Sequence, residues 1–173
     1  MTRSRTITWN DPLESAAYGH GLTGLEFLHR QTSGLIPAAP VADLIGLRGT
    51  YVMPGRVTFE YEPREEQYSS LGAVHGGIVT AVLDSAMCAA MQSVLDAEVG
   101  LATTDLRTTF VRPVTLTTDV FRVEGTVVHA GSRIVTAEAR LVDRTGTLYA
   151  TASSSALVLA GEHRPSVAAQ LVA

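Results

Sequence analysis

The chain has 173 residues, a length typical of a single domain. It is 46% hydrophobic and 17% charged, which indicates a packed core and excludes an intrinsically disordered chain. The formal net charge of −4 gives no general basic field, so we expect no nucleic-acid partner. The single cysteine, Cys88, excludes an internal disulfide and a cysteine-based zinc site and fits a cytoplasmic location. The five histidines show no ligand spacing, so we expect no metal.

The first 46 residues are expected to form an extension attached to the domain. Residues 1–10 are polar and predict a loose tail. Leu and Phe residues at helical spacing predict a short helix over residues 22–31. A Pro-containing connector then leads to one or two helical turns over residues 41–45.

The domain itself is expected over residues 47–160, followed by a tail at residues 161–173. A strand-like segment at residues 48–60 is interrupted by Pro54-Gly55, which predicts two short strands or one bent strand. A long apolar helix is expected over residues 76–95. Four runs rich in Val, Thr and aromatic residues then predict strands, at residues 101–112, 117–129, 133–143 and 147–159. Short breaks between the last three predict antiparallel hairpins, so the fold class is α+β, with one long helix against one antiparallel sheet.

The start and the middle of the long helix carry its unusual residues. His75 precedes Gly76 and Gly77, which have no side chains to keep a ligand from the N–H groups of the helix N-terminus. Asp84 is the one ionised residue between residues 78 and 95. A charge at this position makes a transmembrane helix a poor interpretation, so no membrane partner is expected.

The segment Leu71-Gly72-Ala73-Val74-His75-Gly76-Gly77, followed by Asp84 within this order of elements, resembles the hotdog-fold acyl-CoA thioesterases. Among them it is most similar to the phenylacetic-acid-pathway (PaaI-like) group. The resemblance runs from about residue 47 to residue 159. Further matching segments are Gly55-Arg56-Val57, Thr109-Phe110-Val111-Arg112-Pro113, Arg140-Leu141-Val142-Asp143 and Gly146. The resemblance implies a sheet wrapped around one central helix, acyl-CoA as substrate, no cofactor besides the CoA of the substrate, and homodimers that pair into homotetramers.

The resemblance also assigns roles at the helix. The Gly76 N–H becomes the oxyanion donor, with Gly77 beside it and His75 shaping the turn before it. Asp84 becomes either a general base that deprotonates water or a nucleophile that forms an anhydride. Eight residues of helix separate Gly76 from Asp84 by about 12 Å, too far for one carbonyl. We therefore expect Gly76 from one subunit and Asp84 from its neighbour to form each site.

Two polar helpers follow from the resemblance. Many relatives have an Asn six residues before the histidine, where this chain has Ser69. A Ser or Thr often comes from the strand after the helix, and Thr103 is our choice here over Thr104. Asp105, two residues further on, is expected on the same strand face as Thr103, as a solvated edge charge.

Substrate contacts are expected from cations and from apolar residues. Arg112 and Arg133 are the candidates for the CoA phosphates. An apolar acyl pocket is expected from the N-terminal segment and the long helix, with Leu71, Met87 and Met91 among its candidates.

Alternatives remain at the level of residues and of function. Asp84 could instead cap a loop or pair with an arginine, and Cys88, one turn later, is best interpreted as a small buried apolar residue. A non-catalytic acyl-CoA-binding protein, acting as a carrier or sensor, is the alternative function. A protein whose helix serves only dimer packing is a third hypothesis.

Overall fold

The computed structural model describes residues 2–159, so the expected tail at residues 161–173 lies outside the described residues. The helices are α1 (Pro12–Ala17), α2 (Gly24–Thr32), α3 (Pro40–Ile45) and α4 (Gly76–Gln92), with a 3₁₀ turn at Glu65–Gln67. The strands are β1 (Leu47–Met53), β2 (Arg56–Tyr61), β3 (Gly100–Phe110), β4 (Phe121–Ala130), β5 (Ile134–Val142) and β6 (Leu148–Leu159). Residues 2–10 have no regular structure.

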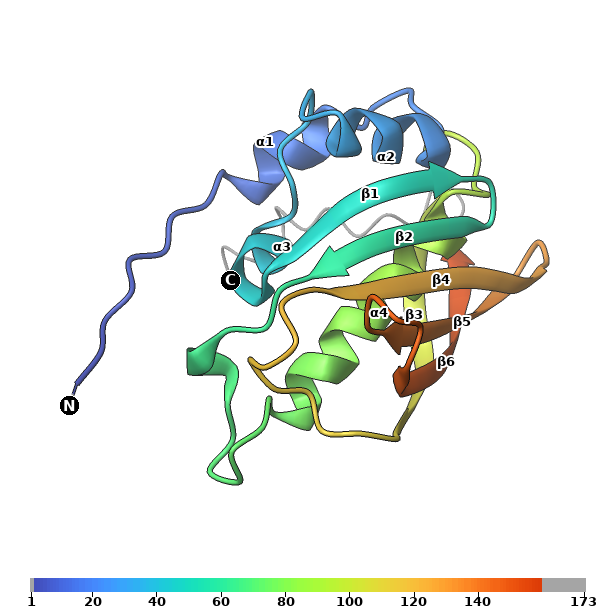
Figure 1. Ribbon diagram of the computed structural model, residues 1–173. Coiled ribbons are helices and arrows are strands. Elements are labelled where there is room, and N and C mark those ends of the chain that lie inside the picture. The colour runs from blue at the N-terminus through green and yellow to red at the C-terminus, as the bar shows by residue number, and fades with distance from the viewer. Residues whose placement is uncertain (1, 160–173) are drawn as a thin grey trace.

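One antiparallel sheet in the order β1-β2-β4-β5-β6-β3 curves around α4 (Figure 1). The expected hairpins β4–β5 and β5–β6 are present, and β1 and β2 form a third hairpin around the turn at Pro54-Gly55. The predicted α+β class and the hotdog arrangement are therefore confirmed. The strand β3 closes one edge of the sheet and has β6 as its single neighbour in the described chain.

The core lies between α4 and the concave face of the sheet. Leu83 and Met87 of α4 are completely buried, as are Tyr61 of β2 and Phe121 of β4. The closest approach falls at Gly125 of β4, where an added side-chain carbon would lie 2.2 Å from the carbonyl oxygen of Ala86. Only glycine lets the helix approach the sheet this closely, because a methyl group there would overlap the helix backbone.

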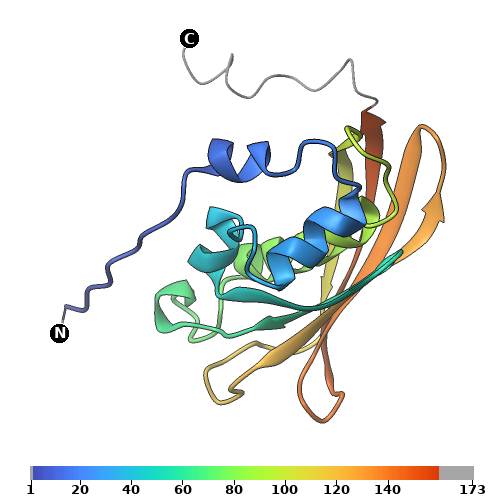
Figure 2. The ribbon, with the colours of Figure 1, turned by 90° about the horizontal axis from the view of Figure 1, so that it is seen from above.

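The helices α2 and α3 pack against both β1 and α4. Figure 2 shows α2 lying across β1 and α4. Thr23 caps α2 in a capping box with Glu26, which fixes where this helix begins. The Gly24 N–H donates to the Leu95 carbonyl at 3.1 Å, which attaches the start of α2 to the segment just after α4. The predicted helix at residues 22–31 is confirmed as α2, whereas α1 was not expected from the sequence.

Candidate active site

The N-terminus of α4 is capped by its own preceding residue. The His75 Nδ1 atom accepts a hydrogen bond from the Gly77 N–H at 3.0 Å, so this nitrogen carries no proton. The Gly76 N–H meets no acceptor among the described residues and is free to bind a ligand oxygen. Phe110, at the end of β3, lies beside it: a side-chain carbon on Gly76 would be 3.1 Å from the Phe110 ring.

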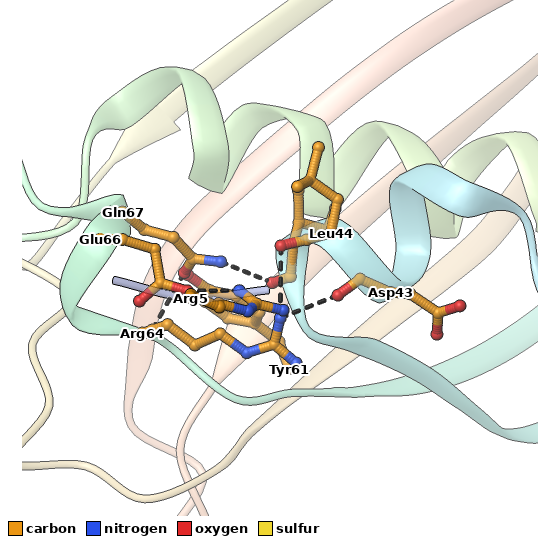
Figure 3. A network of polar contacts seen from close by, with 8 residues as sticks. Arg5, Asp43, Leu44, Tyr61, Arg64, Glu66 and Gln67 are labelled. Carbon is orange, nitrogen blue, oxygen red and sulfur yellow. Dashed lines mark hydrogen bonds and ion pairs between the residues drawn. The ribbon is translucent and has the colours of Figure 1, made fainter. Parts of the chain in front are cut away.

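A buried glutamine holds the loop that leads into α4 (Figure 3). The Gln67 Oε1 atom accepts from the Tyr61 hydroxyl at 2.7 Å and from the Arg64 N–H at 3.1 Å. Its Nε2 atom donates to the Ile45 carbonyl at 2.9 Å. The backbone carbonyl of Gln67 accepts from the His75 N–H at 2.8 Å. Since the side chain of Gln67 is satisfied inside the protein and its backbone holds His75, the loop positions the helix N-terminus.

Charged residues reinforce this loop from outside. The Arg64 guanidinium donates to the carbonyls of Asp43 and Leu44 at the end of α3, at 2.8 and 3.3 Å (Figure 3). Arg5, in the N-terminal segment, pairs with Glu66 of the 3₁₀ turn. This pair is solvent-exposed, so it contributes little to stability on its own.

Ser69 lies in the turn before α4, where many relatives are expected to have an asparagine. Its hydroxyl donates to the Ala73 carbonyl at 3.2 Å and accepts from the Leu71 N–H at 3.3 Å. The Ser69 side chain therefore makes its hydrogen bonds within its own turn and stabilises that turn. Its expected role as a helper of Asp84 stays a prediction.

Asp84, Cys88 and Thr103 form a polar cluster where α4 meets β3. The Cys88 thiol donates to the Asp84 Oδ1 atom at 3.6 Å, and its sulfur lies 3.5 Å from the Thr103 hydroxyl. The structure thus brings the two predicted residues Asp84 and Thr103 together through Cys88. The four-residue spacing of Asp84 and Cys88 could have indicated this pair, but the contact with Thr103 joins α4 to β3 and leaves no local pattern.

The electrostatics of the cluster follow from burial. Partial burial raises the pKa of the Asp84 carboxyl, and the Cys88 hydrogen bond opposes that shift. Burial also raises the pKa of the Cys88 thiol, so the sulfur stays protonated and acts as a donor. No Arg, Lys or His of the described residues pairs with Asp84. The structure therefore gives no support to the alternative in which Asp84 pairs with an arginine.

A β-bulge at Thr104 separates Thr103 from Asp105. Thr103 pairs with Ala156 of β6, whereas Asp105 pairs with the adjacent residue Ser155. Ala156 is completely buried and Ser155 faces the other side of the sheet, so the two β3 residues point to opposite faces. The expectation that Asp105 shares the face of Thr103 is wrong, because the extra residue shifts the alternation.

The two arginines expected to bind phosphate lie far apart within one chain. The Arg112 guanidinium donates to the Leu148 carbonyl at the start of β6, at 2.6 Å. The Arg133 backbone carbonyl accepts from the N–H of Val158, near the other end of β6. Ten residues of strand separate the two ends, about 33 Å at 3.3 Å per residue. One CoA molecule would need arginines from two subunits to contact both.

The expected acyl-pocket residues also occupy different environments. Met87 and Met91 are completely buried in the core between α4 and the sheet. Leu71 is 91% exposed on the turn before α4. Their role in substrate binding therefore stays a prediction, and none of the three lines the cavity of about 720 Å³ between α2, α3 and α4.

The family model described as "Thioesterase superfamily" matches residues 71–150, which span α4 and the candidate site. Over this segment the chain is similar to the thioesterase superfamily. The matched segment contains His75, Gly76, Asp84 and Thr103, and it excludes α1, α2, α3, β1 and β2.

Solved structures of other proteins share the fold of this chain. A thioesterase family protein from Silicibacter pomeroyi is 26% identical, with a TM-score of 0.69, over 78% of this chain and 99% of that chain. A phenylacetic acid degradation-related protein from Ralstonia eutropha is 23% identical, with a TM-score of 0.69, over 75% and 98%. A mutant form of the phenylacetic acid degradation protein PaaI from Thermus thermophilus is 24% identical, with a TM-score of 0.60, over 69% and 98%. The predicted resemblance to hotdog thioesterases is confirmed, and PaaI is among the proteins that share this fold.

Three further observations bear on function. No curated protein matches this chain. Within residues 2–159, no helix has both the length and the apolar character needed to cross a membrane. In the same part of the chain, no group of three or more His, Cys, Asp or Glu side chains is arranged to hold a metal ion.

Proposed function

We propose that this protein hydrolyses acyl-CoA thioesters to a free acid and CoA. The observation that carries the proposal is Asp84, a half-buried carboxylate on α4 with Cys88 as its hydrogen-bond donor and no cation beside it among the described residues. Burial without an opposite charge is costly, so a purely structural role would leave this cost without compensation. A carboxylate with a raised pKa, on the helix that the thioesterase superfamily model matches, suits proton transfer or nucleophilic attack.

The Gly76 N–H is the proposed oxyanion donor. It lies at the first position of a 17-residue helix, where the helix dipole adds to the hydrogen bond. His75 supports it by holding the adjacent Gly77 N–H, so the cap and the donor are separate groups. His75 acts here as a positioning residue.

Two routes use these groups. In the first, Asp84 takes a proton from water, and the resulting hydroxide attacks the thioester carbon. In the second, the Asp84 carboxylate attacks directly and forms an anhydride that water then cleaves. In both routes the carbonyl oxygen becomes an oxyanion held by Gly76, the carbon–sulfur bond breaks, and the CoA thiolate leaves and takes a proton.

The proposed site is shared between two subunits. Gly76 and Asp84 are eight residues apart on one helix, about 12 Å, so one carbonyl cannot contact both in a single chain. The edge strand β3 is 11 residues long, and residues 103–107 along it are exposed. Such an edge is a template for pairing with a second chain. Pairing of two β3 strands about a two-fold axis would lay two α4 helices side by side.

The half-exposed side of α4 supports the same dimer. Ile78, Ala81 and Cys88 are neither buried in the core nor fully exposed. A second α4 would cover these small and apolar residues and complete the burial of Asp84. Assembly of dimers into a homotetramer stays a prediction.

The test is a panel of acyl-CoA esters with detection of the free thiol, for the wild type and for Asp84→Asn. We expect hydrolysis by the wild type and a loss of at least about 10²-fold in kcat in the variant, typical for a missing general base or nucleophile. Unchanged hydrolysis in Asp84→Asn would contradict the proposal.

Binding of acyl-CoA without turnover is the second candidate function. The observation in its favour is the hydroxyl of Ser69, whose hydrogen bonds all stay within its own turn. The same panel decides between the two: acyl-CoA bound by both proteins and hydrolysed by neither supports a carrier or sensor.

A further inference from the structure

A cavity with a volume of about 720 Å³ lies between the helices α2 and α3 and the helix α4. Apolar side chains from α2, α3, β1 and β2 line it, including Leu28, Ala42, Val52 and Phe59. Charged residues, such as Arg48 and Glu62, lie in its wall with exposed side chains. A cavity of this size with an apolar wall and a charged rim is typical of a ligand pocket.

Small residues on one face of α4 create this space. Ser85, Cys88 and Ala89 line the cavity at helical spacing, with Gln92 one turn further on. The helix α2, which forms the opposite wall, packs directly on α4. A side-chain carbon on Gly24 of α2 would lie 1.8 Å from the Gln92 carbonyl oxygen. Since α2 touches the backbone of α4 at this point, the two helices are already in contact and the cavity does not depend on a loose fit between them.

The cavity and the candidate acid meet at Cys88. This residue lines the cavity, and its sulfur lies 3.6 Å from the Asp84 Oδ1 atom. Only the Cys88 side chain therefore separates Asp84 from the cavity, so a thioester held at Asp84 would have this cavity beside it in the same subunit. The walls from α2, α3, β1 and β2 lie outside residues 71–150, so the chamber is built largely by the part of the chain that the superfamily model does not match.

We propose that this cavity holds the acyl chain, and that the substrates are thioesters of medium-length apolar acyl groups rather than of acetate. That the acyl chain arrives as a CoA thioester rests on the proposed function. An acetyl group would leave most of the cavity empty. Each methylene that enters the apolar cavity is expected to raise the affinity about fourfold until the chamber is full.

The first test measures binding without turnover, by isothermal titration calorimetry of decanoate and acetate. We expect decanoate to bind once per subunit and acetate to show no binding at the same concentration. Ala42→Phe fills the cavity from α3 and should weaken decanoate binding at least tenfold. Leu44→Phe changes the exposed side of the same helix, away from the cavity, and should leave it within twofold.

The second test compares turnover of decanoyl-CoA and acetyl-CoA. We expect Ala42→Phe to lower the decanoyl-to-acetyl ratio of kcat/KM at least tenfold. Ala89→Leu narrows the same cavity from α4 and should act in the same direction, which covers the case that Ala42→Phe does not fold. Decanoate binding that neither variant weakens, or no decanoate binding by the wild type, would overturn the chamber.

The two proposals fail in different ways. Decanoate binding that depends on Ala42 without hydrolysis of any ester would contradict the proposed function and leave the chamber in place. Suppose instead that hydrolysis is lost in Asp84→Asn and that the cavity variants leave the chain-length preference unchanged. This result would support the proposed thioesterase activity and contradict the proposal that the cavity holds the acyl chain.

Discussion

The Cys88 sulfur lies 3.6 Å from the Asp84 Oδ1 atom, one turn further along α4. It also lies 3.5 Å from the Thr103 hydroxyl on β3. A thiol is thus the one side-chain donor to the candidate acid within the described chain, and it belongs at the same time to the cavity wall. This position makes Cys88 a positioning residue for the proposed reaction.

We expect Cys88→Ala to shift the acidic limb of the kcat/KM profile to higher pH. The thiol stabilises the ionised carboxylate, so its removal should raise the pKa of Asp84 further. Cys88→Ser keeps a donor and serves as the control, with a smaller shift expected. The measurement is the pH dependence of kcat/KM from about pH 4, near the ordinary carboxyl pKa, to about pH 8. An equal shift in both variants would show that the hydrogen bond is not the cause.

Asp84→Asn should stabilise the protein at neutral pH while it abolishes the proposed activity. The folded protein holds the Asp84 proton more tightly than the unfolded chain, because burial raises the carboxyl pKa. The favourable contribution of this group is therefore complete below its unfolded pKa and is lost as the pH rises through the folded pKa. We expect the urea midpoint of Asp84→Asn to exceed that of the wild type at about pH 7. The difference between the two midpoints should narrow toward about pH 4. A variant less stable than the wild type at neutral pH would contradict this account.

Gly76→Pro should remove the proposed oxyanion donor and leave α4 intact. Proline is well tolerated at the first position of a helix, and His75 already has the extended backbone (ψ 134°) that precedes proline favourably. We expect a loss of about 10²–10³-fold in kcat, as for other single oxyanion donors. Gly76→Ala places a similar carbon near the Phe110 ring but keeps the N–H, and it should lose much less. Equal losses in both variants would indicate a steric effect.

The shared site predicts complementation between two inactive variants. Mixed dimers of Asp84→Asn and Gly76→Pro subunits contain one site with both groups intact and one site with neither. With random mixing, about a quarter of the wild-type activity should return, because half of the dimers are mixed and each has one working site. The measurement is thioesterase activity after joint refolding. No recovery in verified mixed dimers would place both groups of a site in one subunit.

The same geometry predicts where the two α4 helices cross. If Gly76 of one helix lies opposite Asp84 of an antiparallel partner, the two-fold axis passes near the midpoint of that interval, Thr80. Thr80→Cys, in a Cys88→Ser background, should form a dimer disulfide under mild oxidation, seen on a non-reducing gel. Ser132→Cys, in the exposed β4–β5 turn, is the control and should remain monomeric on the gel. Equal cross-linking of both would argue against this axis.

Gly125→Ala should destabilise the fold by about 1–3 kcal/mol, the usual cost of overpacking a core. Its new methyl group would lie 2.2 Å from the Ala86 carbonyl oxygen and would push α4 away from β4. Gly100→Ala, where the nearest contact is an ordinary 3.7 Å, is the matched control and should stay within about 0.5 kcal/mol. Urea unfolding measures both. Similar values for the two variants would contradict the close approach of helix and sheet.

The sequence by itself determined the order and type of the main elements. Runs of Val and Thr with short turns give antiparallel strands, and an apolar stretch opened by His75-Gly76-Gly77 gives α4, because these signals lie within a few residues of one another. The spacing of Gly76 and Asp84 also follows from the sequence, since the rise of a helix is constant.

Only the tertiary structure decided what surrounds those residues. The contact of Cys88 with Thr103, the position of Phe110 beside Gly76, and the cavity under α2 and α3 all join segments far apart in the chain. The bulge at Thr104 changed the face of Asp105, because one extra residue reverses the alternation of a strand. Such features depend on how neighbouring elements pack, and no local pattern encodes them.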